Sequence, residues 1–215
     1  MLTVSEAIRR RRSIRSFRSD PVPDNMVHEI LEAARLAPSA SNRQPWRFMV
    51  VTDGKEKARL RKICLDQAFI EEAPVVLVCC ADLTAYSQSS RKKRAQEFID
   101  YGVTETLSGR FADPAYRAAL LAEPGPDLGA FLTAAVANTY IAIEHMVLTA
   151  TALGLGTCWV GALGNEVEIN AFFGLPQTTV VVAVLPVGYP TVIPPPRPRI
   201  SLSEILLRPL AALSR

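Results

Sequence analysis

A strongly apolar stretch from Ala130 to Leu155 constrains the fold of this chain more than any other feature of the sequence. The stretch is long enough to cross a bilayer as a helix. However, it contains Asn138, Glu144 and His145, which are costly in lipid, and no second apolar stretch of this length accompanies it. We therefore expect a long helix that is buried in a protein core or a subunit interface.

The composition is that of an ordinary globular protein of 215 residues, with 49% apolar and 21% charged residues. Lys and Arg outnumber Asp and Glu by 24 − 21 = 3, so the chain is only mildly basic. This balance argues against a general nucleic-acid or membrane-surface partner. We expect one domain over residues 1–215, in which residues 84–129 form a cap of helices and loops, since they are too poor in apolar residues to make a domain of their own.

The cysteines and histidines do not form a recognisable metal site. The four cysteines are Cys64, Cys79, Cys80 and Cys158, and they contain no C-x-x-C pair followed by histidines at zinc-finger spacing. No bound metal is therefore expected. The N-terminus turns polar by Ser5 and lacks the apolar core of a signal peptide. Together these features predict a reduced, cytoplasmic protein.

Helical and strand-like segments alternate along the chain. The apolar run at 74–80 is typical of a strand covered on both faces. Further strands are expected at 46–52 and 178–187, an extended segment at 157–163, and helices at 24–37, 55–64 and 130–153. No βαβ unit repeats along the sequence, so the pattern predicts an α+β fold with helices packed on a central sheet.

Familiar catalytic motifs are absent from the sequence. The segment Gly154–Trp159 fails as a dinucleotide fingerprint, because Trp159 stands where the third glycine belongs and a helix precedes it. H-E-x-x-H, a phosphate-binding P-loop and G-x-S-x-G are also missing. If the protein is an enzyme, a cofactor is expected to carry the difficult chemical step.

Two cationic clusters lie near opposite ends of the sequence. The first comprises Arg11, Arg12, Ser13 and Arg15, and the second comprises Arg197 and Arg199. Guanidinium groups and a hydroxyl near a helix end suit a phosphate dianion, and both clusters could close on one anion. Taken alone, the first cluster is more typical of a solvated basic face or a nucleic-acid-binding arm than of a phosphate site.

Four groups of segments carry a resemblance to a known family. They are Arg11–Phe17, Ala37–Phe48, Gly154–Gly161, and Pro186–Pro190 followed by Arg197–Arg199. In this order and spacing the chain resembles the FMN-dependent nitroreductase family, and residues 84–129 remain unmatched. The resemblance implies a central, mostly antiparallel sheet flanked by helices, with a long central helix at the interface of a homodimer. It also implies two FMN sites between the subunits.

The resemblance assigns roles to particular residues. The phosphate and ribityl end of FMN would be held by Arg11, Arg12, Ser13, Arg15, Arg197 and Arg199. A loop from the partner subunit would flank the flavin with Pro38, Ser39, Ala40, Ser41 and Asn42. The edge of the isoalloxazine ring would face Trp159, Val160, Gly161 and Ala162. Small residues at the last two positions would let backbone amides approach the ring.

Some positions have two interpretations or depart from the family pattern. Gln67 is either a hydrogen-bond partner for the flavin pyrimidine or a surface helix residue. Some relatives carry a lysine near the place of Phe69 and Ile70, and an acidic residue at the place of Gly161, so the redox tuning of this chain should differ. The run Arg91–Arg94 is either a solvated face or a site of attraction for the phosphate of NADPH.

The resemblance implies an FMN-dependent NAD(P)H oxidoreductase with a ping-pong mechanism. NADH or NADPH would reduce the flavin and leave, and an electron-poor acceptor such as a nitroaromatic or a quinone would then bind at the same face. Because the flavin carries the electrons, no catalytic side chain is expected. The alternatives are a specialised flavin reaction of the same fold, such as reductive dehalogenation, and a flavin-binding protein without enzymatic activity.

Overall fold

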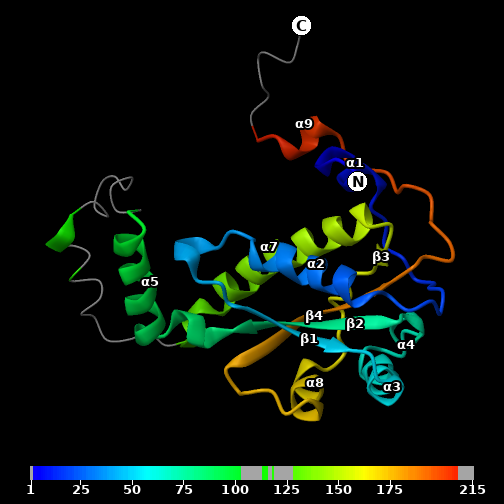
Figure 1. Ribbon diagram of the computed structural model, residues 1–215, viewed down its shortest axis with the longest axis horizontal. Helices are drawn as coiled ribbons and strands as arrows, with labels where there is room; N and C mark the ends of the chain where they lie inside the picture. Colours follow the sequence, from blue (N-terminus) through cyan, green and yellow to red (C-terminus); the bar gives the residue numbers. More distant parts are fainter. Residues whose placement is uncertain (1, 103–112, 116–117, 119–127, 208–215) are drawn as a thin grey trace, which may run out of the picture.

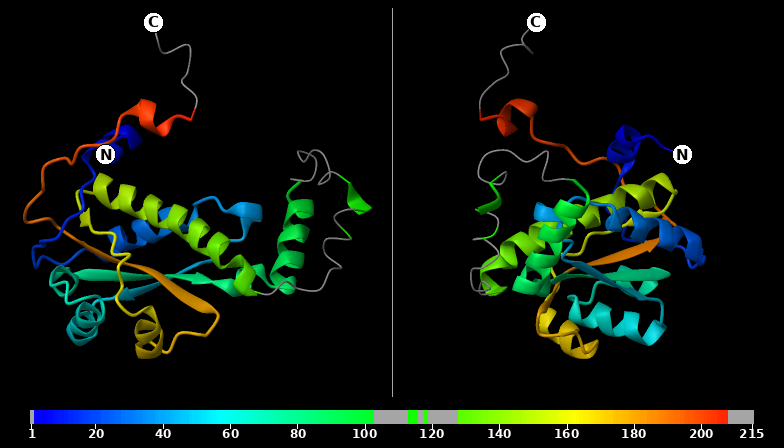
Figure 2. Two further views of the ribbon diagram at one scale, coloured as in Figure 1. Left: turned by 180° about the vertical axis from the view of Figure 1, so that it is seen from behind. Right: turned by 60° about the vertical axis from the view of Figure 1, so that its left-hand side comes forward.

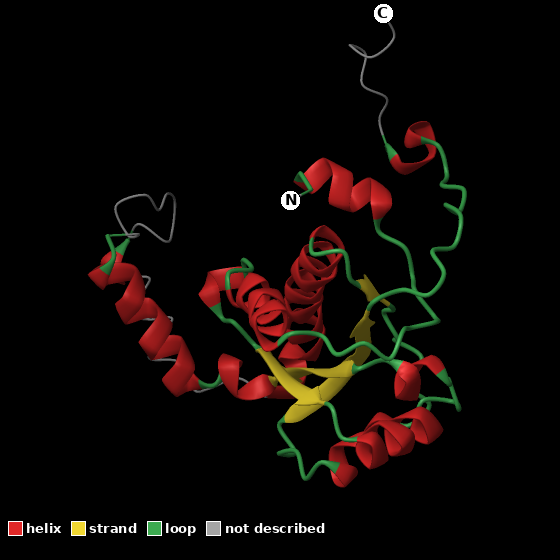
Figure 3. Ribbon diagram, turned by 45° about the vertical axis from the view of Figure 1, so that its right-hand side comes forward, coloured by secondary structure: helices red, strands yellow, loops and turns green. Residues whose placement is uncertain are grey.

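The computed structural model describes residues 2–102, 113–115, 118 and 128–207. In this part of the chain, an antiparallel sheet lies between two layers of helices (Figures 1 and 3). The strands are β1 (Trp46–Val51), β2 (Val75–Asp82), β3 (Gly156–Thr157) and β4 (Thr179–Gly188), in the order β1-β2-β4-β3. All three neighbouring pairs are antiparallel, which confirms the expected class and sheet type.

The central strand β2 explains why the sheet is covered on both faces. Leu77 and Cys79 pack on one side, while Val76 and Val78 pack on the other, and all four side chains are buried. Successive residues of a strand point to opposite faces, so a continuous apolar run needs two helical layers. A β-bulge at Cys79 and Cys80 shifts the register of β2 against β4.

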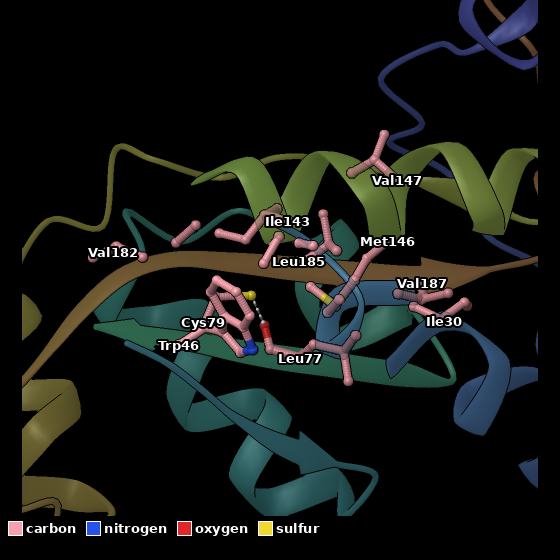
Figure 4. Packing of buried hydrophobic residues seen from close by; sticks show 14 of the residues in the cluster. Ile30, Trp46, Leu77, Cys79, Ile143, Met146, Val147, Val182, Leu185 and Val187 are labelled. Carbon is pink, nitrogen blue, oxygen red and sulfur yellow. Dashed lines mark hydrogen bonds between the residues drawn. The ribbon is translucent and has the colours of Figure 1, made fainter. Parts of the chain in front are cut away.

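The first helical layer contains α2 (Asp24–Arg35) and α7 (Leu132–Ala152). Figure 4 shows Ile143 and Met146 of α7 pointing toward Leu185 and Leu77 of the sheet. By length and composition alone, the segment Gly129–Ala152 could cross a membrane, and 39% of its most apolar window is buried within this one chain. The expected long helix is therefore present, and it packs on the sheet through one side.

The second layer contains α3 (Gly54–Ile63), α4 (Phe69–Glu72) and α8 (Glu166–Phe172), on the opposite face of the sheet (Figure 1). Short polar residues start two of these helices. Asp53 accepts hydrogen bonds from the backbone N–H groups at the start of α3, and Asn165 does the same for α8. Such capping satisfies N–H groups that have no partner within a helix.

Both ends of the described chain lie on the α2/α7 side of the sheet. They carry α1 (Val4–Arg10) and α9 (Leu202–Ile205), each of which begins with a capping box (Figure 2). The expected extended segment at 157–163 pairs with β4 only in part. Only Gly156 and Thr157 form β3, followed by one bridge between Val160 and Val184.

The expected cap is described in part. It includes two 3₁₀ helices, η2 (Leu83–Tyr86) and η5 (Leu128–Phe131), and the helix α5 (Gln88–Asp100). Helix α5 stands at the end of the molecule away from α1 and α9 (Figures 1 and 2). Residues 103–112, 116–117 and 119–127 of the cap lie outside the described residues, and the single domain over 1–215 remains a prediction.

Candidate functional site

A cavity of about 450 Å³ lies between the N-terminal part of the chain and the proline-rich segment that follows β4. Its lining consists of Ile8, Arg9, Arg11, Arg12, Ser13, Arg15, Pro194, Pro195, Pro196, Arg197 and Arg199. The two cationic clusters therefore line one cavity, although they are far apart in the sequence. Every member of both clusters contributes to its wall.

Backbone pairing with β3 fixes the first cluster in place. Ile14 donates a hydrogen bond from its N–H to the carbonyl oxygen of Thr157 at 2.8 Å, and its side chain is buried. A Cβ atom on Gly156 would lie 2.5 Å from Cγ1 of Ile14, closer than such atoms can approach. Glycine at position 156 is therefore what allows the arginine-bearing segment to lie against the sheet.

The second cluster is positioned by the same segment of the chain. Arg18 donates its N–H to the carbonyl oxygen of Tyr189 at 2.9 Å, and Thr191 donates its N–H to that of Ser16 at 3.0 Å. Residues 13–18 thus pair with β3 on one side and with residues 189–191 on the other. The chain then continues through prolines, which fix φ, to Arg197 and Arg199.

The arginines of the cavity form no close ion pair in the described part of the chain, and Glu144 of α7 interacts with Arg11 only at longer range. Among the described residues, no Asp or Glu oxygen lies within 4.0 Å of the guanidinium nitrogens of these arginines: Arg11, Arg12, Arg15, Arg197 and Arg199. Arg12 donates from Nη1 to the carbonyl oxygens of Arg9 and Arg11, at 2.7 and 2.8 Å. Its Nε is buried, and no acceptor for it occurs in the described structure. An anion in this cavity would supply acceptors that the protein itself lacks.

Two further contacts extend from the cavity toward the second helical layer. The guanidinium carbon of Arg15 lies 5.9 Å from the ring centroid of Phe69, at the start of α4. Burial raises the pKa of the Cys158 thiol, while the nearby positive charges of Arg15 and Arg11 act in the opposite direction. The thiol is therefore protonated at neutral pH, as befits a packed cysteine.

The segment after β3 runs outward from the cavity along the edge of the sheet. Val160 and Val184 exchange two backbone hydrogen bonds of 3.0 Å, and Trp159 packs edge-on against Tyr140 with ring centroids 5.1 Å apart. Beyond them, Gly161 and Ala162 are exposed, and a Cβ on Gly161 would have no neighbour within 4 Å. An extended chain rises about 3.3 Å per residue, so this open backbone begins roughly 13 Å from Thr157.

The loop of Pro38, Ser39, Ala40, Ser41 and Asn42 is rigidly tied to α7. Asn138 accepts a hydrogen bond from the N–H of Ala40 at 3.0 Å and donates another to the hydroxyl of Tyr86 at 2.9 Å. Ser41 and Asn42 both have φ of 52°, an unfavourable conformation for residues other than glycine. A strained loop held by buried hydrogen bonds is a common feature of functional sites.

The loop and the arginine cavity lie at opposite ends of α7 in one chain. The loop is bonded to Asn138, whereas Thr151, at the other end of α7, shares a neighbouring cavity of about 340 Å³ with Arg12. At about 1.5 Å per residue, Asn138 and Thr151 are roughly 20 Å apart along the helix. The structure therefore does not bring this loop to the cavity of its own subunit.

Gln67 precedes α4, and its side chain bonds to the nearby backbone. Its Nε2 donates to the carbonyl oxygen of Cys64 at 2.9 Å, and the side chain is half-buried. The preceding residues Leu65 and Asp66 have φ of 60° and 54°. Phe69, where some relatives carry a lysine, is buried beneath the guanidinium of Arg15. Sequence reasoning did not find this contact. It places the positive charge of Arg15 beside Phe69, where some relatives carry a lysine.

Sequence reasoning also missed Asn138, Tyr86 and Arg43 as parts of one arrangement. The guanidinium carbon of Arg43 lies 5.7 Å from the ring centroid of Tyr86. A signal existed only for Asn138, as a polar residue within the apolar stretch. Within the described residues, no group of three or more His, Cys, Asp or Glu side chains could hold a metal ion.

Comparison with solved structures identifies the class of fold. A nitroreductase-like protein from Streptococcus mutans superposes with a TM-score of 0.77 at 19% identity, covering 94% of this chain and 96% of the other. The NADPH:FMN oxidoreductase of Vibrio harveyi, in a complex with NAD⁺, gives a TM-score of 0.73 at 22% identity, covering 95% and 76% of the two chains. The fold is thus the nitroreductase fold.

Comparison of sequences identifies the family. The model of the Nitroreductase family matches residues 8–189. A Thermus thermophilus protein named NADH dehydrogenase is 36% identical over 208 residues, which are 96% of each chain. The FMN reductase [NAD(P)H] of Bacillus subtilis is 30% identical over 191 residues, covering 88% of this chain and 67% of the relative. The chain belongs to the nitroreductase family, a family of oxidoreductases.

Proposed function

We propose that the protein is an FMN-dependent NAD(P)H oxidoreductase that reduces electron-poor small molecules such as nitroaromatics and quinones. The observation that carries this proposal is the single cavity lined by Arg11, Arg12, Ser13, Arg15, Arg197 and Arg199. Relatives named FMN reductase [NAD(P)H] and NADPH-flavin oxidoreductase support it. A cytoplasmic location is part of the proposal, and it is consistent with four cysteines that are all free.

The arginine cavity fits the phosphate end of FMN. A phosphate monoester carries close to two negative charges and accepts paired hydrogen bonds from guanidinium groups. In the described chain these arginines have no carboxylate partners, and the buried Nε of Arg12 has no acceptor. Ser13, half-buried on the cavity wall, would donate its hydroxyl to the phosphate or the ribityl chain.

The open backbone after β3 fits the ring end of the cofactor. Trp159, Val160, Gly161 and Ala162 would lie along the isoalloxazine edge, about 13 Å of extended chain from the arginine-bound segment. Val160 is held by its bridge to β4, and Gly161 leaves room for the ring to approach the backbone. Gln67 would contact the flavin pyrimidine by exchanging its present hydrogen bond to the carbonyl oxygen of Cys64.

The proposed functional unit is a homodimer. The loop of Pro38, Ser39, Ala40, Ser41 and Asn42 would flank the flavin of the partner subunit, since it is bonded to Asn138, about 20 Å along α7 from Thr151, which lies beside Arg12 of the same subunit. Helix α7 exposes Leu132, Tyr140 and Ile141, each 38 to 41% accessible, and the C-terminal segment exposes Ile200, Leu202 and Ile205. A second subunit that covers these apolar side chains would be stabilised by their burial.

When bound, FMN would accept a hydride from NADH or NADPH and pass electrons to the second substrate, in a ping-pong order. The residues of the chain bind and orient the cofactor and exclude water from one side of it. No side chain is assigned to proton transfer, because solvent can supply protons at an open site. Because the cofactor would carry the electrons and solvent the protons, the proposed reaction needs no catalytic acid–base pair from the protein.

A visible absorption spectrum tests the proposal. The purified protein should be yellow, release FMN on denaturation, and lose its flavin absorbance when NADH or NADPH is added without oxygen. A colourless protein that cannot bind added FMN would refute the cofactor assignment. If FMN is bound but neither nucleotide reduces it, the protein is a flavin-binding protein without this activity. A screen of nitroaromatic, quinone and halogenated acceptors then separates general reduction from a specialised reaction such as dehalogenation.

A further inference from the structure

A third cationic cluster, made of Arg43, Arg91 and Arg94, lies beyond the loop of residues 38–42, at the end of the molecule away from the arginine cavity. Its centre is Arg43, whose guanidinium carbon is 5.7 Å from the ring centroid of Tyr86. Nη1 of Arg43 is buried, and the described structure offers it no hydrogen-bond partner. Buried donors of native proteins are nearly always satisfied, so this one points to an acceptor that the described part of the chain does not supply.

Two arginines of α5 face Arg43 and add to its positive charge. The pKa of Arg43 is lowered by burial first, and then by the charges of Arg91 and Arg94. Arg94 is paired with Glu97, donating from Nη1 to both carboxylate oxygens at 2.8 and 2.7 Å. A purely structural arrangement would pair Arg43 with a carboxylate instead of facing it with like charges.

The cluster is held rigidly relative to the loop. Asn138 joins the N–H of Ala40 to the hydroxyl of Tyr86, and the Tyr86 ring stacks on Phe131 with centroids 5.0 Å apart. Arg43 lies against the ring of Tyr86, whose hydroxyl accepts the hydrogen bond from Asn138. The guanidinium group is thus preorganised, which reduces the entropy that a ligand must overcome.

We propose that Arg43, Arg91 and Arg94 form a binding subsite for a phosphomonoester dianion carried by a substrate that approaches the flavin of the partner subunit. Such a group carries close to two negative charges at pH 7 and would supply an acceptor for the buried Nη1 of Arg43 beside two further arginines. The proposal rests on the proposed function, because the loop of residues 38–42 brings Arg43 to the rim of the neighbouring flavin site. The phosphate has two possible sources, the 2′-phosphate of NADPH and a phosphate on the electron acceptor.

Two matched pairs of substrates, each differing only by one phosphate, distinguish these sources. NADPH and NADH are compared as reductants, and free FMN and riboflavin are compared as acceptors with the reductant held constant. The protein is used as the FMN-loaded holoenzyme. In one of the two pairs, kcat/KM should be at least about tenfold higher for the phosphorylated member. One charge-assisted hydrogen bond to the phosphate accounts for a preference of this size. The pair that shows this preference identifies the source.

Variants locate the preference on the cluster. Arg43→Gln, and separately the double variant Arg91→Gln/Arg94→Gln, should reduce the preference for the phosphorylated member to near parity. The matched control is Lys92→Gln/Lys93→Gln, which removes the same charge from exposed positions of the same helix and should retain the preference. The α5 double variant leaves the loop intact, so it tests the subsite even if Arg43→Gln disturbs folding.

Three outcomes would overturn the subsite while leaving the proposed function standing: no preference in either pair, a preference that survives both cluster variants, or an equal loss in the control. The proposed function fails separately, if neither nucleotide reduces the bound flavin. In that event, calorimetry of adenosine 2′,5′-bisphosphate binding to the protein tests the subsite independently of flavin reduction. Binding that is weakened at least about tenfold by Arg91→Gln/Arg94→Gln supports the subsite, and binding that is absent or unchanged in the variant overturns it.

Discussion

Replacing Gly156 by alanine tests whether close packing against β3 positions the arginine cluster. The added Cβ would lie 2.5 Å from Cγ1 of Ile14, where ordinary contact begins at 3.4 Å, so something must move by about 3.4 − 2.5 = 0.9 Å. Ile14 is 3% exposed and its N–H bonds to Thr157 at 2.8 Å, so a shift of the segment would break that bond. Overpacking costs about 1–3 kcal/mol and the lost bond about 1 kcal/mol.

We expect Gly156→Ala to lower the free energy of unfolding by about 2–4 kcal/mol. For a chain of this length, that corresponds to a fall in Tm of roughly 4–16 °C, measured by thermal denaturation. Displacement of Ser13 and Arg15 should also weaken FMN binding by about tenfold or more, measured by fluorescence titration of the apoprotein. The loss of affinity follows from the altered position of these residues, since no charge is removed.

Two further variants control for side effects. Gly161→Ala adds the same methyl group at a position with no neighbour within 4 Å, so its Tm should stay close to that of the native protein. Ile14→Ala in the Gly156→Ala background removes Cγ1 and should recover part of the lost FMN affinity. If Gly156→Ala alone keeps both its native Tm and its FMN affinity, the claim that this glycine positions the cluster is wrong.

Three other predictions follow from the described contacts. Arg15→Ala and Arg199→Ala should each reduce FMN affinity by about tenfold to a hundredfold, whereas Arg18→Ala, which removes an arginine paired with Asp20 outside the cavity, should not; equal losses in all three would contradict the phosphate assignment. Asn138→Ala should lower the free energy of unfolding by about 1–3 kcal/mol in urea denaturation, because buried hydrogen-bonding groups lose their partner, and an unchanged midpoint would argue against this. Burial raises the pKa of all four cysteine thiols above the ordinary value of 9.0. Unfolded thiols therefore ionise first as the pH rises above about 9, so the free energy of unfolding should fall there, and a four-cysteine-to-serine variant should lose this pH dependence.

The secondary structure of the layers could be predicted because its causes are local. The alternation of Val76, Leu77, Val78 and Cys79 between two apolar faces follows from strand geometry and the residues themselves. The long helix was likewise evident from its apolar length. The β-bulge after Cys79 could not be predicted, because it depends on how β4 aligns with β2 and not on either sequence alone.

The candidate site was predictable in chemistry and only partly in geometry. Similar residue types at both ends of the chain, Arg15 and Arg199 among them, indicated a shared anion, and both line the same cavity. The contact between Arg15 and Phe69 could not be foreseen, since neither residue is unusual in its local sequence. Arg43 was missed for a related reason. It lies against the ring of Tyr86, which is far along the chain and has no sequence pattern that points back to Arg43.

The division of the arginine cavity between distant segments has a consequence for biosynthesis. Residues 11–15 leave the ribosome early, and residues 194–199 follow only after nearly the whole intervening polypeptide has been made. At about 5–20 residues per second, this delay is on the order of ten to forty seconds. A nascent chain would present half of the pocket during that interval and could not retain an anion that needs both halves. Cofactor loading would then be a late maturation event, open only to chains that have been translated past Arg199.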